Sequence, residues 1–233
     1  MIKQKKHTCL LITLTCGCCS IVQADVHDVV VQDNNFTPSN INIVAGDTVR
    51  WENFGNHNHN VVSTDLNYLF YCANGCEDTG GDSTPAGLGW VAEVTFHKPD
   101  SNIPYVCEPH VNFGMTGSIS VSTPSTYTTV TVSNANAFVP QSLTIEQHDR
   151  VLFVNGGGEH NIYADDGSFR CADGCRDDSV QGDDDPTGFP WQFFKQFNET
   201  GTFTYHCQTP GHDETGIITV VDSLIFANGF ESL

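Results

Sequence analysis

The feature that most constrains this chain is an internal repeat. Aromatic, histidine and cysteine residues recur in the same order after an offset that stays between 99 and 102 residues. The clearest matches are Phe36 with Phe138, His59 with His160, Cys72 with Cys171, Trp90 with Trp191, and Cys107 with Cys207. Because both copies keep the same order and spacing, we expect two homologous domains at residues 25–122 and 128–222, joined by a linker at 123–127.

Short β-strands are the secondary structure that each copy predicts. β-branched or alternating segments are bounded by Gly, Pro, Asn and Asp, which is typical of strands and turns. The expected strands are 26–31, 41–44, 48–51, 91–96 and 118–121, then 128–132, 143–145, 151–154, 201–205 and 217–221. No amphipathic helix of three turns is found. The pattern indicates an all-β fold of two tandem Greek-key β-sandwiches.

The first 24 residues have the pattern of a secretory signal peptide. Three lysines among the first six residues precede an apolar run that ends near Val22, and small residues stand at Val22 and Ala24. We expect cleavage after Ala24 and a secreted or periplasmic mature protein. No other segment approaches the roughly 18 to 20 apolar residues that a membrane-spanning helix needs, so we expect no transmembrane segment.

The charge balance restricts the partners. The chain has 28 Asp and Glu against 9 Lys and Arg, which gives a formal net charge of −19. Loss of the three lysines of the signal would make the mature charge −22. Nucleic-acid binding through neutralised phosphates is therefore excluded. A charged protein partner is expected to be basic.

Six cysteines remain after the signal, in two similar sets. Each set has a close pair with three intervening residues, followed by a lone cysteine 31 or 32 positions later. In an oxidising compartment this arrangement predicts the disulfides Cys72–Cys76 and Cys171–Cys175. The close spacing also occurs in binuclear copper sites, but those need a histidine soon after the second cysteine, and residues 77–80 and 176–179 have none.

The lone cysteine of the first copy lies among other metal-binding side chains. Cys107, His110 and Met115 stand within nine residues, and His59 precedes Cys107 by 48 residues. A thiolate with two imidazoles and a thioether suits copper. Four protein ligands leave no open position for a substrate, so the set favours electron transfer over catalysis.

These residues resemble those of the plastocyanin-type cupredoxins. The resemblance rests on residues 59–62 (His-Asn-Val-Val), 105–110 (Tyr-Val-Cys-Glu-Pro-His) and 114–117 (Gly-Met-Thr-Gly), and it covers nearly all of residues 26–122. It implies a type 1 copper bound by His59, Cys107, His110 and Met115. It also implies that Asn60 braces the ligand loop and that electrons pass through the exposed edge of His110.

The second copy keeps three of these ligand types. His160, Cys207 and His212 are present, and the four residues between Cys207 and His212 resemble the azurin-like ligand loop. Asn161 follows the first histidine, as Asn60 does in the first copy. The resemblance thus implies a second copper, and one or two coppers per chain are expected. A degenerate second domain without copper is the alternative.

The sequence does not identify the fourth ligand of the second copy, because no methionine follows His212. Aligning Thr215-Gly216 with Thr116-Gly117 places Glu214 at the position of Met115. Counting five residues from His212 places Ile217 there instead. We favour Glu214, because the alternation of buried residues fixes the register of the following strand.

An electron carrier of the periplasm or cell exterior is the function that the sequence favours, and we expect no enzyme activity. A trinuclear oxidase cluster in this superfamily takes eight histidines, whereas five remain: His27, His57, His97, His148 and His206. A nitrite-reductase-like enzyme and a copper storage or delivery protein are the alternatives. The expected partner is a basic, cytochrome-like redox protein or a copper oxidase or reductase.

Two further segments carry weaker signals. The acidic run at 183–185 offers the oxygen ligands that Ca²⁺ prefers, although a solvated acidic loop is the favoured interpretation. The apolar tail at 223–233 follows the last expected strand and resembles a Gly-Phe-Glu ending of some secreted bacterial proteins.

Overall fold

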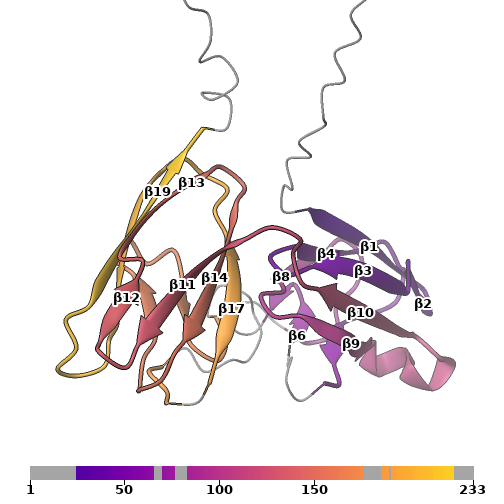
Figure 1. The fold of residues 1–233 in the computed structure, drawn as a ribbon. Helices are drawn as coiled ribbons and strands as arrows, with labels where there is room; N and C mark the ends of the chain where they lie inside the picture. The colour runs from indigo at the N-terminus through magenta and orange to yellow at the C-terminus, as the bar shows by residue number, and fades with distance from the viewer. Residues whose placement is uncertain (1–24, 66–69, 77–82, 176–184, 189, 223–233) are drawn as a thin grey trace, which may run out of the picture.

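The computed structural model describes residues 25–65, 70–76, 83–175, 185–188 and 190–222, which form two β-sandwiches in sequence order (Figure 1). In the first sandwich a four-stranded sheet has the order β2-β1-β4-β8, and it faces a six-stranded sheet of order β3-β10-β9-β5-β6-β7. The strands are β1 (Val26–Gln32), β2 (Asn35–Thr37), β3 (Asn40–Val44), β4 (Thr48–Asn53), β5 (Val61–Ser63), β6 (Tyr71–Ala73), β7 (Gly75–Cys76), β8 (Val91–Thr95), β9 (Asp100–Val106) and β10 (Thr116–Ser122).

The second sandwich repeats this topology. Its sheets have the orders β12-β11-β14-β17 and β13-β19-β18-β15-β16. Its strands are β11 (Thr128–Ser133), β12 (Ala137–Val139), β13 (Ser142–Glu146), β14 (Arg150–Asn155), β15 (Ile162–Ala164), β16 (Arg170–Cys171), β17 (Gln192–Gln196), β18 (Gly201–His206) and β19 (Thr215–Val221). The parallel pairs β1–β4 and β3–β10 recur as β11–β14 and β13–β19. The all-β, tandem Greek-key prediction is confirmed.

Among the described residues, nine strands and one helix were not expected from the sequence; the strands are β2, β5, β6, β7, β9, β12, β15, β16 and β17. Strand β9 contains Pro104, which weakens a strand signal. Strand β17 does not alternate, because Phe193 and Phe194 on its opposite faces are both buried. A short 3-10 helix, η2 (Glu108–Phe113), also stands where only a loop was expected. Among the described residues, no helix is long and apolar enough to cross a membrane.

Each core is centred on a buried aromatic pair. Trp51 packs edge-on against Tyr105 with ring centroids 5.7 Å apart, and Phe153 packs in the same way against Tyr205 at 5.6 Å. Both tyrosine rings lie over a glycine of the neighbouring strand, where a Cβ atom would overlap the ring. These glycines are Gly117, opposite Tyr105, and Gly216, opposite Tyr205.

The two sandwiches pack through one outer sheet face of the second. Leu152 of β14 and Phe194 of β17 are paired across that face, and both belong to the buried cluster of the first sandwich. The equivalent pair of the first sandwich is Arg50 with Glu93, an ion pair of 3.4 Å between two largely exposed side chains. The same sheet face is therefore apolar in one copy and charged in the other.

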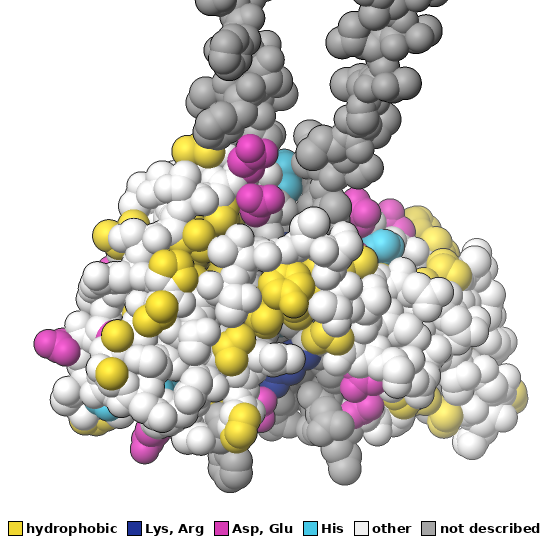
Figure 2. All heavy atoms as spheres, in the orientation of Figure 1, with side chains coloured by type: hydrophobic (Ala, Val, Ile, Leu, Met, Phe, Trp, Pro, Cys, Tyr) yellow, Lys and Arg dark blue, Asp and Glu magenta, His cyan; other side chains and the backbone are white. Residues whose placement is uncertain are grey.

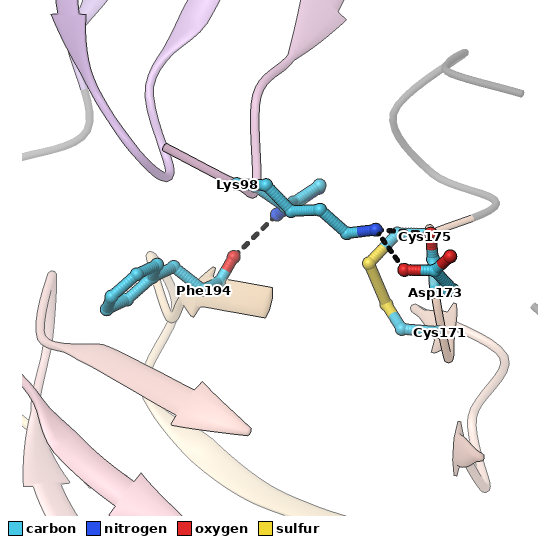
Figure 3. Close-up of a disulfide and its surroundings, with 6 residues drawn as sticks. Lys98, Cys171, Asp173, Cys175 and Phe194 are labelled. Carbon is cyan, nitrogen blue, oxygen red and sulfur yellow. Dashed lines mark hydrogen bonds and ion pairs between the residues drawn. A yellow bond between two sulfur atoms is a disulfide. The ribbon is translucent and has the colours of Figure 1, made fainter. Parts of the chain in front are cut away.

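Polar contacts fix this interface. Arg150 donates to Asp47 at 2.7 Å with both side chains almost fully buried. The Phe194 amide donates to the His97 carbonyl at 2.8 Å. Lys98 reaches the loop closed by the Cys171–Cys175 disulfide, where it donates to the carbonyl and, at 2.7 Å, to the carboxylate of Asp173 (Figure 3).

Replacing Phe194 by Ala tests whether this face is a packed core. Because the ring is 2% exposed between two domains, we expect Phe194→Ala to lower the free energy of unfolding by about 3–5 kcal/mol. The matched control is Glu93→Ala at the equivalent solvent-facing position, which should cost no more than about 0.5 kcal/mol. Chemical denaturation measures both; equal effects of the two variants would contradict the interface.

Candidate metal centres

The first cluster of metal-binding side chains lies where β9 runs into η2. Cys107 directly follows β9, and its Sγ lies 3.5 Å from Nδ1 of His59 and 3.4 Å from Nδ1 of His110. The three donor atoms lie within 4.8 Å of one another. His59 and Cys107 are fully buried, whereas His110 is partly exposed. The sequence-predicted thiol and imidazoles are thus brought together.

The loop that carries His110 is shaped by its own sequence. Pro109 stands in the first turn of η2, where its missing N–H costs no hydrogen bond. Gly114 ends the helix in the left-handed region, with φ 82°, and its amide donates to the carbonyl of Val111. The turn brings the backbone of Met115 beside His110, because the Met115 amide donates to the His110 carbonyl at 3.2 Å. The side chain of Met115 is buried.

Asn60 ties this loop to the strand that carries His59. Its side-chain carbonyl accepts the Glu108 amide at 2.9 Å, and its side-chain amide donates to the Glu108 carboxylate at 2.7 Å. Asn161 makes the equivalent pair of bonds with Gln208 in the second copy, at 2.8 and 3.0 Å. Both asparagines are fully buried, so each joins two segments that are distant in sequence.

The second cluster has four donors. Sγ of Cys207 lies 3.7 Å from Nδ1 of His160 and 3.8 Å from Nδ1 of His212. One carboxylate oxygen of Glu214 lies 2.9 Å from Nδ1 of His160 and 3.3 Å from Nδ1 of His212. All four donor atoms lie within 4.8 Å of one another, and the Glu214 side chain is 1% exposed.

Strand pairing shows which residue of the second copy replaces Met115. Thr116 and Gly117 pair with Val106 and Tyr105, and Thr215 and Gly216 pair in the same way with His206 and Tyr205. Glu214 therefore stands in the register position of Met115. Ile217, the alternative, lies farther along β19 and is 38% exposed. The structure places the carboxylate of Glu214 beside the other three donors.

Burial controls the protonation of these groups. It raises the pKa of the Cys107 and Cys207 thiols, so a metal ion that binds the thiolate displaces a proton. Burial acts in the same direction on Glu214, but hydrogen bonds from its own backbone N–H, Cys207 and His160 outweigh it and hold the pKa of Glu214 below its ordinary value.

The other histidines have separate partners. His27 lies 3.0 Å from Asp47, His57 lies 3.0 Å from Asp33, and Nδ1 of His206 lies 2.6 Å from Asp165. His97 contacts the Phe194 carbonyl between the domains, and His148 contacts Asn198. In the part of the chain that the structure describes, the two clusters above are the only groups of three or more His, Cys, Asp or Glu donors.

One residue near the first cluster carries no sequence signal. Asp33, in the turn between β1 and β2, lies 3.4 Å from Nε2 of His59. No spacing rule connects a hairpin turn to a ligand 26 residues later.

The structure contains both expected disulfides, Cys72–Cys76 and Cys171–Cys175. The expected signal peptide at 1–24, the tail at 223–233 and most of the acidic run at 183–185 lie outside the described residues.

Comparison with known proteins gives a consistent family. The family of copper-binding proteins of the plastocyanin/azurin type matches residues 24–122 and again 126–222. A plastocyanin from Scenedesmus fuscus is 31% identical over 101 residues, which cover 37% of this chain and 85% of that protein. A purple cupredoxin from Nitrosopumilus maritimus is 22% identical and covers 41% of this chain and 99% of its own, with a TM-score of 0.32.

A second solved structure, pseudoazurin from Hyphomicrobium denitrificans, is 20% identical with a TM-score of 0.32 and covers 43% of this chain and 77% of its own. Each of these two structures matches less than half of the chain. The family match, by contrast, covers both repeats. The chain is therefore a tandem member of the plastocyanin/azurin family of copper-binding proteins.

Proposed function

We propose that this protein is an electron carrier with one copper centre in each domain. The observation that carries the proposal is the pair of closed His₂Cys clusters, each completed by a buried fourth residue at the same register position. The ligands of the first centre are His59, Cys107, His110 and Met115. Those of the second centre are His160, Cys207, His212 and Glu214.

The chemistry of the donor sets supports copper. A thiol that is fully buried beside two imidazole Nδ1 atoms has a soft sulfur and two nitrogens aimed at one point. This combination suits copper better than Mg²⁺ or Ca²⁺, which take oxygen ligands. Copper bound there would supply one-electron redox chemistry between Cu(I) and Cu(II). We propose no Ca²⁺ site.

The surroundings of the clusters favour a carrier over an enzyme. A reactive copper would need further histidines close together, but the remaining histidines of the described chain contact carboxylates, a backbone carbonyl or, for His148, the side-chain amide of Asn198. His206, which stands where a nitrite-reductase-like enzyme has a ligand histidine, faces Asp165 and Tyr163. Four protein donors, of which only the second histidine of each cluster is partly exposed, also leave little room for a substrate.

The surfaces above the two centres differ, which supports two different contacts with redox partners. The rim of His110 is apolar: Val111 is 40% and Phe113 74% exposed. The exposed residues around His212 include Gln208 and Asp213, so that rim is polar. Acidic side chains stand at several points of the face seen in Figure 2. The acidic surface favours a basic, cytochrome-like partner.

The disulfides support a location outside the cytoplasm. Cys72–Cys76 and Cys171–Cys175 need an oxidising compartment to persist, such as the periplasm or the cell exterior. A redox titration of the copper-loaded protein with a basic cytochrome tests the carrier function. Reversible exchange of electrons is the expected result; copper that binds but does not exchange electrons would indicate storage or delivery instead.

Copper counting tests the two centres separately. We expect two coppers per fully loaded chain, with Cys107→Ser and Cys207→Ser each removing the thiolate-to-copper absorption of one centre, because only the thiolate supplies that transition. Metal analysis and visible spectroscopy measure both effects. One copper per chain that is unaffected by Cys207→Ser would leave a single-centre carrier.

The identity of the fourth ligand predicts the order of the two reduction potentials. A carboxylate stabilises Cu(II), so we expect the second centre to have the lower potential. Glu214→Met should raise the potential of the second centre and leave the first unchanged, as measured by a spectroscopic redox titration. The matched reverse variant is Met115→Glu, which should lower only the first. A second potential that does not respond to Glu214→Met would rule out Glu214 as a ligand.

A further inference from the structure

Asp33 contacts the side of His59 that faces away from the first cluster. Its Oδ1 lies 3.4 Å from Nε2 of His59, while Nδ1 of the same ring lies 3.5 Å from Sγ of Cys107. The His59 ring is fully buried, and Asp33 is 31% exposed. The carboxylate is thus the group that links this buried ring to the surface.

Gly55 makes the contact between Asp33 and His59 sterically possible, because it has no Cβ atom. A Cβ atom there would lie 2.6 Å from Nε2 of His59 and 2.9 Å from Oδ1 of Asp33. Any other residue would have to push the two groups apart. The absence of a side chain at Gly55 therefore allows the His59 ring and the Asp33 carboxylate to come into contact.

The Asp33 carboxylate is held in place rather than free on the surface. Its Oδ1 accepts the amide of Asn56 at 2.7 Å and that of His57 at 3.1 Å, and it lies 3.0 Å from Nδ1 of His57. These contacts hold the carboxylate in one orientation beside the ring of His59.

The second domain lacks this anion. Asn134 follows Ser133 at the end of β11, as Asp33 follows Gln32 at the end of β1. Its amide lies over Gly157, near the ring of His160. Nε2 of His160 is buried and has no hydrogen-bond partner among the described residues. The equivalent position therefore holds a charged side chain, Asp33, in the first domain and a neutral one, Asn134, in the second.

We propose that Asp33 is a positioning residue of the first copper centre. It accepts the Nε2 proton of His59, so that Nδ1 is left free for the metal, and its negative charge stabilises the oxidised centre. Carboxylates behind ligand histidines act in this way, by fixing the tautomer and raising the basicity of the ring. The proposal rests on copper binding at the first cluster, as proposed above.

The two domains offer reciprocal variants as the test. Asp33→Asn removes the charge and should raise the reduction potential of the first centre without moving that of the second. Asn134→Asp introduces the charge and should lower only the potential of the second centre. Asp33→Glu keeps the charge and should retain a potential nearer to the original. Potentials are measured by redox titration followed in the visible band of each centre.

A charge-matched control separates this effect from the general field of the protein. Asp28 lies on the same strand β1 and pairs with Arg50 at a largely exposed position. Asp28→Asn removes the same charge from the same domain and should leave both potentials unchanged. The proposal is overturned if Asp33→Asn leaves the first potential unchanged or shifts it no more than Asp28→Asn does.

Nitrogen-15 NMR of the metal-free protein tests the tautomer independently of copper. We expect the proton of His59 on Nε2, with a mixture of the two tautomers in Asp33→Asn. A proton on Nδ1 in the unmodified chain would overturn the proposal. If the visible band of the first centre fails to form at all, the copper proposal fails, and this experiment still decides whether Asp33 orients His59.

Discussion

A tyrosine ring packed on a glycine is the contact on which both ligand loops depend. Tyr105 is fully buried and covers Gly117, and Tyr205 covers Gly216. Each glycine follows Met115 or Glu214 by two residues, so the contact helps to set where these two residues stand. Core packing therefore contributes to the arrangement of both clusters.

Much of the fold and most of the metal-binding side chains could be predicted from the sequence, because the spacing of these residues recurs in both copies. The cysteines of each disulfide and the His and Cys donors of each cluster all belong to one domain, so their positions follow from contacts within that domain. Strand β17 was missed because Phe194 is buried by the other domain, which removes the alternation that marks a half-exposed strand. Asp33 was missed because a hairpin turn and a ligand strand meet only in three dimensions.

Each cluster has a carboxylate beside its first histidine, but the two carboxylates lie near different nitrogen atoms of the ring. In the first, Asp33 stands behind His59, outside the donor set. In the second, Glu214 stands among the donors, and no residue that the structure describes forms a hydrogen bond with Nε2 of His160. Duplicated domains with the same core thus differ in where one negative charge lies relative to the same imidazole. The electrostatic surroundings of the two clusters differ at three equivalent pairs of positions: Asp33 and Asn134, Met115 and Glu214, and Glu108 and Gln208.

The packing of the domains also limits how far such a repeat can grow. In solenoid proteins every unit presents an apolar face on both sides, so units can be added without end. Here the face that carries Leu152 and Phe194 in the second domain carries Arg50 and Glu93 in the first. A further domain docking there in the same way would have to strip water from that ion pair. Strands β4 and β8 of the first domain therefore present a charged pair where a stacking unit would need an apolar face.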